Sequence, residues 1–271
     1  MTTPSANQRL AWLNVAAGAA ARAADFITEE SKSRDTIVWA EKSTTDFVSR
    51  VDLGAEDIIR RHFAQEAPEI RVVGEEMGGG ATEEGLVAIV DPLDGTTNFL
   101  HGYPCYAVSI CVALNGVPQA AAISDVARGG LYTATLGGGA FVDGTPIHVS
   151  AITIPARALI GTGFPFKDQS FAAQYLAQFA TLTPQVAGLR RAGAAALDLC
   201  DVARGRFDGF WELMLASWDL AAGVLLIREA GGMATDLAGN DAPLRAGPIV
   251  ASNGVMHDWL LSQLAVPPRA P

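Results

Sequence analysis

Hydrophobic and polar positions in the first third of the chain follow helix-like spacing twice, with strand-like runs between. Apolar residues recur every three or four positions over 7–30, which predicts an amphipathic helix. A short strand is predicted at 37–40. A polar stretch then leads into a second helix, whose apolar side begins at Phe47 and which Pro68 ends. An apolar run at 70–73 predicts the next strand.

The middle of the chain favours strands, and the part after about residue 150 alternates strand with helix. Asn115-Gly116 between two apolar runs predicts a tight hairpin. The predicted strands of the middle part are 86–91, 105–114, 117–124, 131–136 and 140–142. Beyond it we expect strand 158–161, helix 170–180, strand 186–189, helix 193–203, strand 207–212, helix 217–230, strand 248–251 and helix 254–264. This change predicts an N-terminal α+β half, 1–148, and a C-terminal α/β half, 149–271, which share one layered core.

Composition and charge narrow the class of protein. Hydrophobic residues make up 49% of the 271 residues and charged residues 18%, which is typical of a globular chain. The net charge of −10 argues against nucleic acid as a partner. No apolar run approaches the roughly 20 residues that span a bilayer, so no membrane partner is expected. Cys105, Cys111 and Cys200 form no paired motif, which favours reduced thiols and a cytoplasmic location.

The segment 91–99, Asp-Pro-Leu-Asp-Gly-Thr-Thr-Asn-Phe, is the most informative stretch of the chain, and a strand-like apolar run leads directly into it. Asp91 and Asp94 lie three residues apart on a predicted turn, and carboxylate oxygens are the ligands that hard cations prefer. Gly95 and Thr96 follow at a predicted helix start, where free backbone N–H groups can bind phosphate. The segment therefore predicts metal-assisted phosphate chemistry.

Further carboxylates stand at strand ends or helix starts. Glu75 and Glu76 end one predicted strand, Glu212 ends another, and Asp219 opens a predicted helix. Such positions converge on one edge of a layered α/β protein, where carboxylates repel one another unless cations neutralise them. This pattern predicts Mg²⁺ sites. The alternative is that each acid is a solvated loop or cap residue, as Asp219 would be in a first helical turn.

Other catalytic patterns are missing from the sequence. No two of the four histidines lie within five residues of each other, so a helical zinc pair is excluded. The chain has no GxSxG, no Walker A motif and no GxGxxG after a strand. Trp218 precedes Asp219 and is expected to pack so that this carboxylate is held in place.

These segments together resemble the inositol monophosphatase family, which belongs to the Mg²⁺-dependent, lithium-sensitive phosphatases. The resemblance covers roughly residues 10–264. The residues that carry it are Lys42, Asp46, Asp52, Gly74-Glu75-Glu76, the run from Asp91 to Phe99, Gly193 to Leu197, Glu212, Trp218-Asp219 and Asn253. It implies a layered αβαβα sandwich of the sugar-phosphatase type, two or three Mg²⁺ ions per site, hydrolysis of a small phosphomonoester by a metal-activated water, and a homodimer.

The resemblance also implies a ligand set for the metals. Glu75, Asp91 and the carbonyl of Leu93 would hold the first Mg²⁺. Asp91, Asp94 and Asp219 would hold the second, and Glu75 would help to bind a third. Asp219 would lie against the substrate as well.

The same resemblance implies the substrate contacts. Gly95 and Thr96 would give N–H groups to the phosphate, and Thr96 with Glu75 would orient and deprotonate the attacking water. Ala195 through its backbone, Glu212 and Asp94 would contact the alcohol part of the substrate. The remaining implied residues are Asp52, catalytic through the outer shell of the metal site, and the supporting residues Lys42, Glu76 and Trp218. Lys42 has the alternative of pairing only with Asp46.

The sequence does not single out one substrate. Inositol-1-phosphate is the first expectation, and histidinol phosphate or another sugar or nucleotide phosphate is the alternative, since such activities share the metal motifs. The apolar stretch 214–217 disfavours a second phosphate pocket, although Arg190 and Arg191 would suit one. A regulatory binding protein without catalysis is a second alternative, and the complete set of acids argues against it. A nuclease would need a basic track that this acidic chain lacks.

Overall fold

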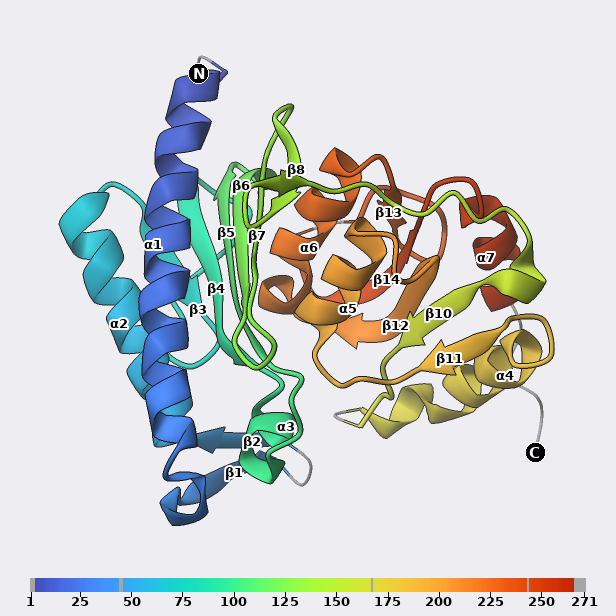
Figure 1. Ribbon diagram of the computed structural model, residues 1–271, viewed down its shortest axis with the longest axis horizontal. Helices are drawn as coiled ribbons and strands as arrows, with labels where there is room; N and C mark the ends of the chain where they lie inside the picture. The colour runs from blue at the N-terminus through green and yellow to red at the C-terminus, as the bar shows by residue number, and fades with distance from the viewer. Residues whose placement is uncertain (1–2, 44–45, 167, 243, 266–271) are drawn as a thin grey trace.

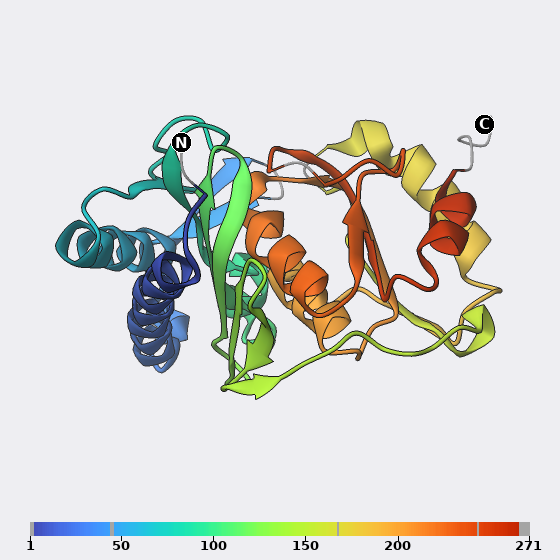
Figure 2. The ribbon, with the colours of Figure 1, turned by 90° about the horizontal axis from the view of Figure 1, so that it is seen from above.

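Five layers, two of them β-sheets, make up the molecule in the computed structural model, which describes residues 3–43, 46–166, 168–242 and 244–265 (Figures 1 and 2). The helices are α1 (Ala6–Ser31), α2 (Arg50–Glu66), α3 (Thr96–His101), α4 (Ala172–Leu182), α5 (Ala195–Ala203), α6 (Ser217–Glu229) and α7 (His257–Leu264). Short 3₁₀ turns are η1 (Arg34–Thr36), η2 (Pro155–Arg157) and η3 (Gln169–Phe171).

The larger sheet has seven strands in sequence order. They are β3 (Arg71–Gly74), β4 (Leu86–Asp94), β5 (Ala107–Leu114), β6 (Val117–Asp125), β7 (Leu131–Thr135), β8 (Gly139–Val142) and β9 (Thr145–Pro146). β3 pairs with β4 in parallel, and every later pair is antiparallel. The two residues of the Asn115-Gly116 hairpin both have positive φ, as the sequence predicts for a tight turn.

The smaller sheet has five strands in a mixed order. Across the sheet they are β11 (Gly188–Arg190), β10 (Leu159–Thr162), β12 (Gly209–Leu215), β14 (Gly247–Ser252) and β13 (Met233–Thr235). β10 is parallel to both neighbours, whereas β14 is antiparallel to both of its own. A separate two-stranded ribbon pairs β1 (Trp39–Ser43) with β2 (Asp46–Ser49).

Helices form three layers around the two sheets. α1 and α2 cover one face of the larger sheet, α5 and α6 lie between the sheets, and α4 and α7 cover the outer face of the smaller sheet (Figures 1 and 2). The expected αβαβα sandwich is therefore confirmed. β4 shows why its sequence is almost continuously apolar: Ala88 and Val90 pack toward α1 and α2, whereas Val87 and Ile89 pack toward α5 and α6.

The predicted start of the second helix is wrong. Phe47 lies in β2, and α2 begins only at Arg50. The Ser49 hydroxyl accepts a hydrogen bond from Val51 N–H at 3.1 Å, and Asp52 accepts one from Ser49 N–H at 2.8 Å. This capping box fixes the helix start, so the aromatic and β-branched residues before it are free to pair as a strand.

Candidate active site

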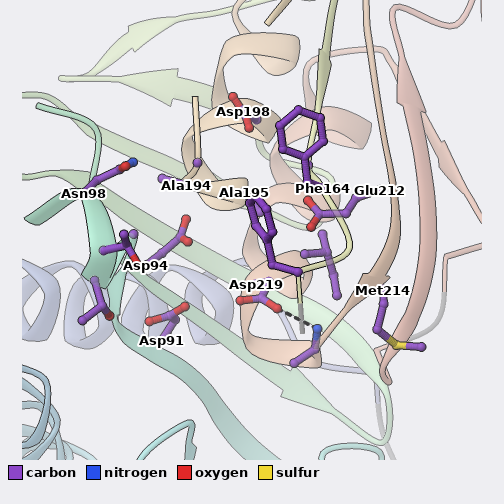
Figure 3. Close-up of a pocket in the computed structure, with 18 of the residues that line it drawn as sticks. Asp91, Asp94, Asn98, Phe164, Ala194, Ala195, Asp198, Glu212, Met214 and Asp219 are labelled. Carbon is purple, nitrogen blue, oxygen red and sulfur yellow. Dashed lines mark hydrogen bonds between the residues drawn. The ribbon is translucent and has the colours of Figure 1, made fainter. Parts of the chain in front are cut away.

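A cavity of about 560 Å³ opens between the two sheets, where the end of β4 meets the N-termini of α3, α5 and α6. Figure 3 shows Asp91, Asp94 and Asp219 on one side of this cavity, with Phe164 and Glu212 on another. All the predicted metal and substrate residues line it, and so does the supporting residue Trp218. These are Glu75, Asp91, Leu93, Asp94, Gly95, Thr96, Ala195, Glu212, Trp218 and Asp219. Four separate parts of the chain thus meet at one place.

An irregular turn at the end of β4 aims two carboxyl groups into the cavity. The pairing of β4 with β5 shifts between Asp91 and Asp94, so the strand bulges there. Leu93 N–H donates to Asp91 Oδ1 at 3.0 Å, which fixes the turn. Gly95 then starts α3 with φ +89°, and a Cβ at this position would lie 2.8 Å from the Cys105 carbonyl oxygen. The turn therefore requires glycine.

The carboxyl groups of Asp91, Asp94 and Asp219 form one cluster. Each offers an oxygen that lies within 4.8 Å of the other two, and Asp91 and Asp94 are only 1% and 8% exposed. Burial, followed by the charges of Glu75, Asp94 and Asp219, raises the pKa of Asp91 well above its usual range. Burial, followed by the charge of Asp219, raises the pKa of Asp94 to about 8. Several buried carboxylates that disfavour one another's charge are the donor set a divalent hard cation would relieve, so the site fits Mg²⁺.

Two of the three carboxylates also cap helices of the central layer. Asp219 accepts a hydrogen bond from Ala216 N–H at 2.6 Å at the start of α6. Asp94 accepts one from Ala196 N–H at 2.7 Å at the start of α5. The sequence left two alternatives for Asp219, a helix cap or a member of a carboxylate cluster, and in the structure it is both. The bond from Asp94 ties the larger sheet to a helix that belongs to the second half of the chain.

Thr96 and Asp52 form a polar pair behind the cluster. The Thr96 hydroxyl lies 2.7 Å from Asp52 Oδ1 and 3.1 Å from the Leu93 carbonyl oxygen. Burial raises the pKa of Asp52, although hydrogen bonds from Thr96 and Ser49 oppose the shift. Asp52 itself is buried and does not line the cavity. It reaches the site through its hydrogen bond with Thr96, and its supporting role stays a prediction.

The supporting residues differ in where they lie. Trp218 lines the cavity and packs on the core between the sheets. Glu76 does not line the cavity, and its backbone N–H donates to the buried Glu56 at 2.8 Å. Lys42 belongs to β1, and its side chain, like that of Asp46, lies outside the described part of the structure.

The match to known proteins covers the segments that carry these site residues. The model of the inositol monophosphatase family matches residues 9–266. The chain belongs to this family.

Relatives within the inositol monophosphatase family carry two kinds of name. An inositol-1-monophosphatase of Rhizobium meliloti is 43% identical over 246 residues, which cover 90% of this chain and 92% of the relative. A putative Nus factor SuhB of Neisseria meningitidis serogroup B is 44% identical over 243 residues, covering 89% and 93%. The crystal structure of extragenic suppressor protein suhB from Bartonella henselae superimposes with a TM-score of 0.89 at 38% identity, covering 94% of this chain and 98% of that one.

Several residues of the cavity were not predicted from the sequence. Asp198, in the first turn of α5, lines the cavity and is buried. Arg191, considered only as a possible phosphate ligand, lies with its guanidinium carbon 5.5 Å and 5.0 Å from the ring centroids of Phe164 and Phe166. Asn98 donates from Nδ2 to the Cys105 carbonyl at 2.7 Å and to the Ala192 carbonyl at 2.9 Å. A carboxyl group three positions after Ala195 on a predicted helix was the one available signal for Asp198.

No helix within the described residues is long and apolar enough to cross a membrane.

Proposed function

We propose that the protein hydrolyses a small phosphomonoester in a Mg²⁺-dependent reaction, with inositol-1-phosphate as the first candidate substrate. The observation that carries this proposal is the cluster of Asp91, Asp94 and Asp219 beside the start of α3. The first N–H groups of a helix have no partner within it, so Gly95 and Thr96 are suited to bind a phosphate that also contacts the cluster. The family to which the chain belongs supports the same reaction class.

The residues of the chain would divide the work in this reaction. Asp91, Asp94 and Asp219, together with Glu75 and the carbonyl of Leu93, would hold two or three Mg²⁺ ions. When bound, these ions supply positive charge to the transferring phosphoryl group and lower the pKa of water. Their ligands are fixed beforehand, since two of the carboxylates are locked onto helix N-termini. Preorganised ligands need no rearrangement during the reaction.

Proton transfer would fall to Glu75 and Thr96. Glu75 lines the cavity beside the cluster and would accept a proton from the attacking water. The Thr96 hydroxyl donates toward Asp52 and the Leu93 carbonyl, so its two lone pairs would be available to accept a hydrogen bond from that water and orient it. Ala195 and Glu212 line the part of the cavity assigned to the alcohol. No covalent intermediate is required.

A regulatory binding role is the second candidate, because relatives with the name Nus factor are as similar to this chain as those named inositol-1-monophosphatase. The complete carboxyl cluster favours catalysis over this role. A homodimer and a cytoplasmic location stay predictions.

Phosphate release from inositol-1-phosphate and histidinol phosphate, measured with and without Mg²⁺ and Li⁺, tests the proposal. We expect release that requires Mg²⁺, is inhibited by Li⁺ and is lost in Asp94→Asn. Asp57→Asn, on the exposed side of α2, is the matched control and should keep full activity. Release that survives Asp94→Asn, or that needs no divalent cation, would remove the catalytic assignment.

A further inference from the structure

Asp198 is a buried carboxyl group at the end of the cavity away from Asp91. It stands in the first turn of α5 and is 2% exposed, yet it lines the cavity. Figure 3 shows it on the side of Ala194 and Ala195 that faces away from the carboxyl cluster, and Phe164 lines the same cavity. Asp198 is thus placed to meet the alcohol part of a substrate whose phosphate lies at the cluster.

Within the described residues, the carboxyl of Asp198 accepts no hydrogen bond and joins no ion pair. The side-chain atoms that lack both a hydrogen-bond partner and contact with solvent do not include the Asp198 oxygens. These oxygens therefore face the cavity that Asp198 lines. Asp201, one turn further along α5, is different, because it accepts a hydrogen bond from Arg206 at 3.1 Å. A buried carboxyl group without a protein partner is costly unless something in the cavity bonds to it.

The charges around Asp198 indicate what that partner is. Burial, followed by the charge of Glu212, raises the pKa of Asp198 well above its usual range, and only Arg191 opposes this among the main contributors. A carboxyl group that favours its neutral form can both donate and accept, as a hydroxyl partner requires. Phe164 and Phe166 hold the guanidinium of Arg191 at the same cavity, where it would repel a substrate ammonium group.

We propose that Asp198 hydrogen-bonds a hydroxyl on the alcohol part of the substrate, so that this end of the cavity selects an uncharged polyol phosphate over an amino-alcohol phosphate. This inference rests on the proposed phosphatase function and adds a substrate contact to it. Glu212, on β12, lies against Gly163, where a Cβ would be 2.0 Å from Glu212 Oε2, and it forms the neighbouring wall.

Kinetics of Asp198→Ala and Asp198→Asn on three esters test the inference: inositol-1-phosphate, histidinol phosphate and ethyl phosphate, which has no further hydroxyl. For Asp198→Ala we expect KM for inositol-1-phosphate to rise roughly five- to tenfold, as for one lost hydrogen bond, with kcat little changed. KM for ethyl phosphate should not change. Asp198→Asn keeps a donor and an acceptor and should raise KM for inositol-1-phosphate only about two- to threefold.

Three outcomes would overturn the inference. Equal changes for ethyl phosphate and inositol-1-phosphate would make Asp198 a structural residue. If Asp198→Asn raised KM for histidinol phosphate more than KM for inositol-1-phosphate, the negative charge of Asp198 would recognise an amine. Unchanged KM for all three esters would mean that Asp198 touches no substrate.

Two controls separate binding from folding. Asp201→Asn removes a carboxylate that has protein partners on the same helix, so it should lower the melting temperature without altering the preference among esters. Asp198→Asn removes a carboxyl group that has no protein partner, so the melting temperature of this variant should equal or exceed that of the wild type. A clear drop in the melting temperature of Asp198→Asn would contradict the absence of a protein partner.

Calorimetry distinguishes failure of the inference from failure of the proposed function. If the wild type releases no phosphate from any ester with Mg²⁺, the proposed function fails. Binding of inositol-1-phosphate and of inorganic phosphate to the wild type and to Asp198→Ala still tests the subsite. We expect weaker binding of inositol-1-phosphate alone, and equal affinities in the two proteins would overturn the inference.

Discussion

Glu56→Gln is expected to destabilise the fold and weaken Mg²⁺ binding, although Glu56 does not line the cavity. Its side chain on α2 is fully buried and accepts hydrogen bonds from Arg60 Nε at 2.8 Å and from the backbone N–H groups of Glu76 at 2.8 Å and Met77 at 3.2 Å. The turn that it holds follows directly after Glu75, which lines the cavity. Loosening this turn therefore displaces a proposed metal ligand.

The size of the effect follows from the donors around the carboxylate. Both oxygens of Glu56 face donors, so the NH₂ group of a glutamine would meet an N–H group in either orientation. One hydrogen bond to a charged acceptor is lost, and at least one partly buried donor is left unpaired, which together cost about 2–4 kcal/mol. Local rearrangement offers no relief, because a Cβ on Gly74 would already lie 2.2 Å from Glu56 Oε1.

Urea unfolding of Glu56→Gln measures this cost, and the Mg²⁺ concentration for half-maximal phosphate release measures the effect on the site. Asp57 is the next residue on the same helix and forms an exposed ion pair with Arg61. Breaking this pair in Asp57→Asn should lower the unfolding free energy by less than about 1 kcal/mol. A difference of about 0.5 kcal/mol is near the usual uncertainty of unfolding free energies. If the unfolding free energy of Glu56→Gln differs from that of the wild type by no more than this, the buried carboxylate does not hold the turn. An unchanged Mg²⁺ requirement would show that the turn does not position Glu75.

Further outcomes follow from the β4 turn and its carboxylates. Gly95→Ala should lower the unfolding free energy by about 1–3 kcal/mol, measured in urea, because an L-residue is strained at φ +89° and its Cβ would meet the Cys105 carbonyl. The melting temperature of the metal-free protein should fall as the pH rises from about 4 to about 8, because folded Asp94 with its raised pKa keeps a proton that the unfolded chain releases in this window. Added Mg²⁺ should therefore raise the melting temperature more at pH 8 than at pH 6, and Asp94→Asn should flatten both dependences.

Long secondary-structure elements were predictable from the sequence where apolar residues keep one spacing over many positions. The helix predicted at 7–30 is found as Ala6–Ser31, because its apolar face continues over the whole length. The convergence of Asp91, Asp94 and Asp219 was also predictable, since strand ends and helix starts of layered folds meet at one edge. β13 has three residues, which is too short for a periodic signal, and it was not predicted. The six residues of α3 are also too few for a periodic signal, and only its start at Gly95 was predicted.

Asp198 and Glu56 were not predictable because their importance depends on what packs around them. Every residue of α5 is buried, since the helix lies between two sheets, and a sequence pattern gives no sign of which buried position faces a cavity. In the sequence Glu56 is one more charge on the amphipathic α2 with a possible partner in Arg60, yet two of its donors come from a turn about twenty residues away. Single-sequence spacing carries no information about such contacts.

The dual role of Asp94 and Asp219 explains how one cluster of like charges is kept in a folded protein. Each carboxylate accepts a backbone N–H at a helix start, where the positive end of the helix dipole favours its charge. That help is incomplete, because the pKa of Asp94 still lies near 8. The helices α5 and α6 are clamped between both sheets, so the carboxylates cannot move apart to lower their repulsion. Divalent cations are the remaining way to relieve it, and the fold therefore stores, in the metal-free state, part of the free energy with which it would bind them.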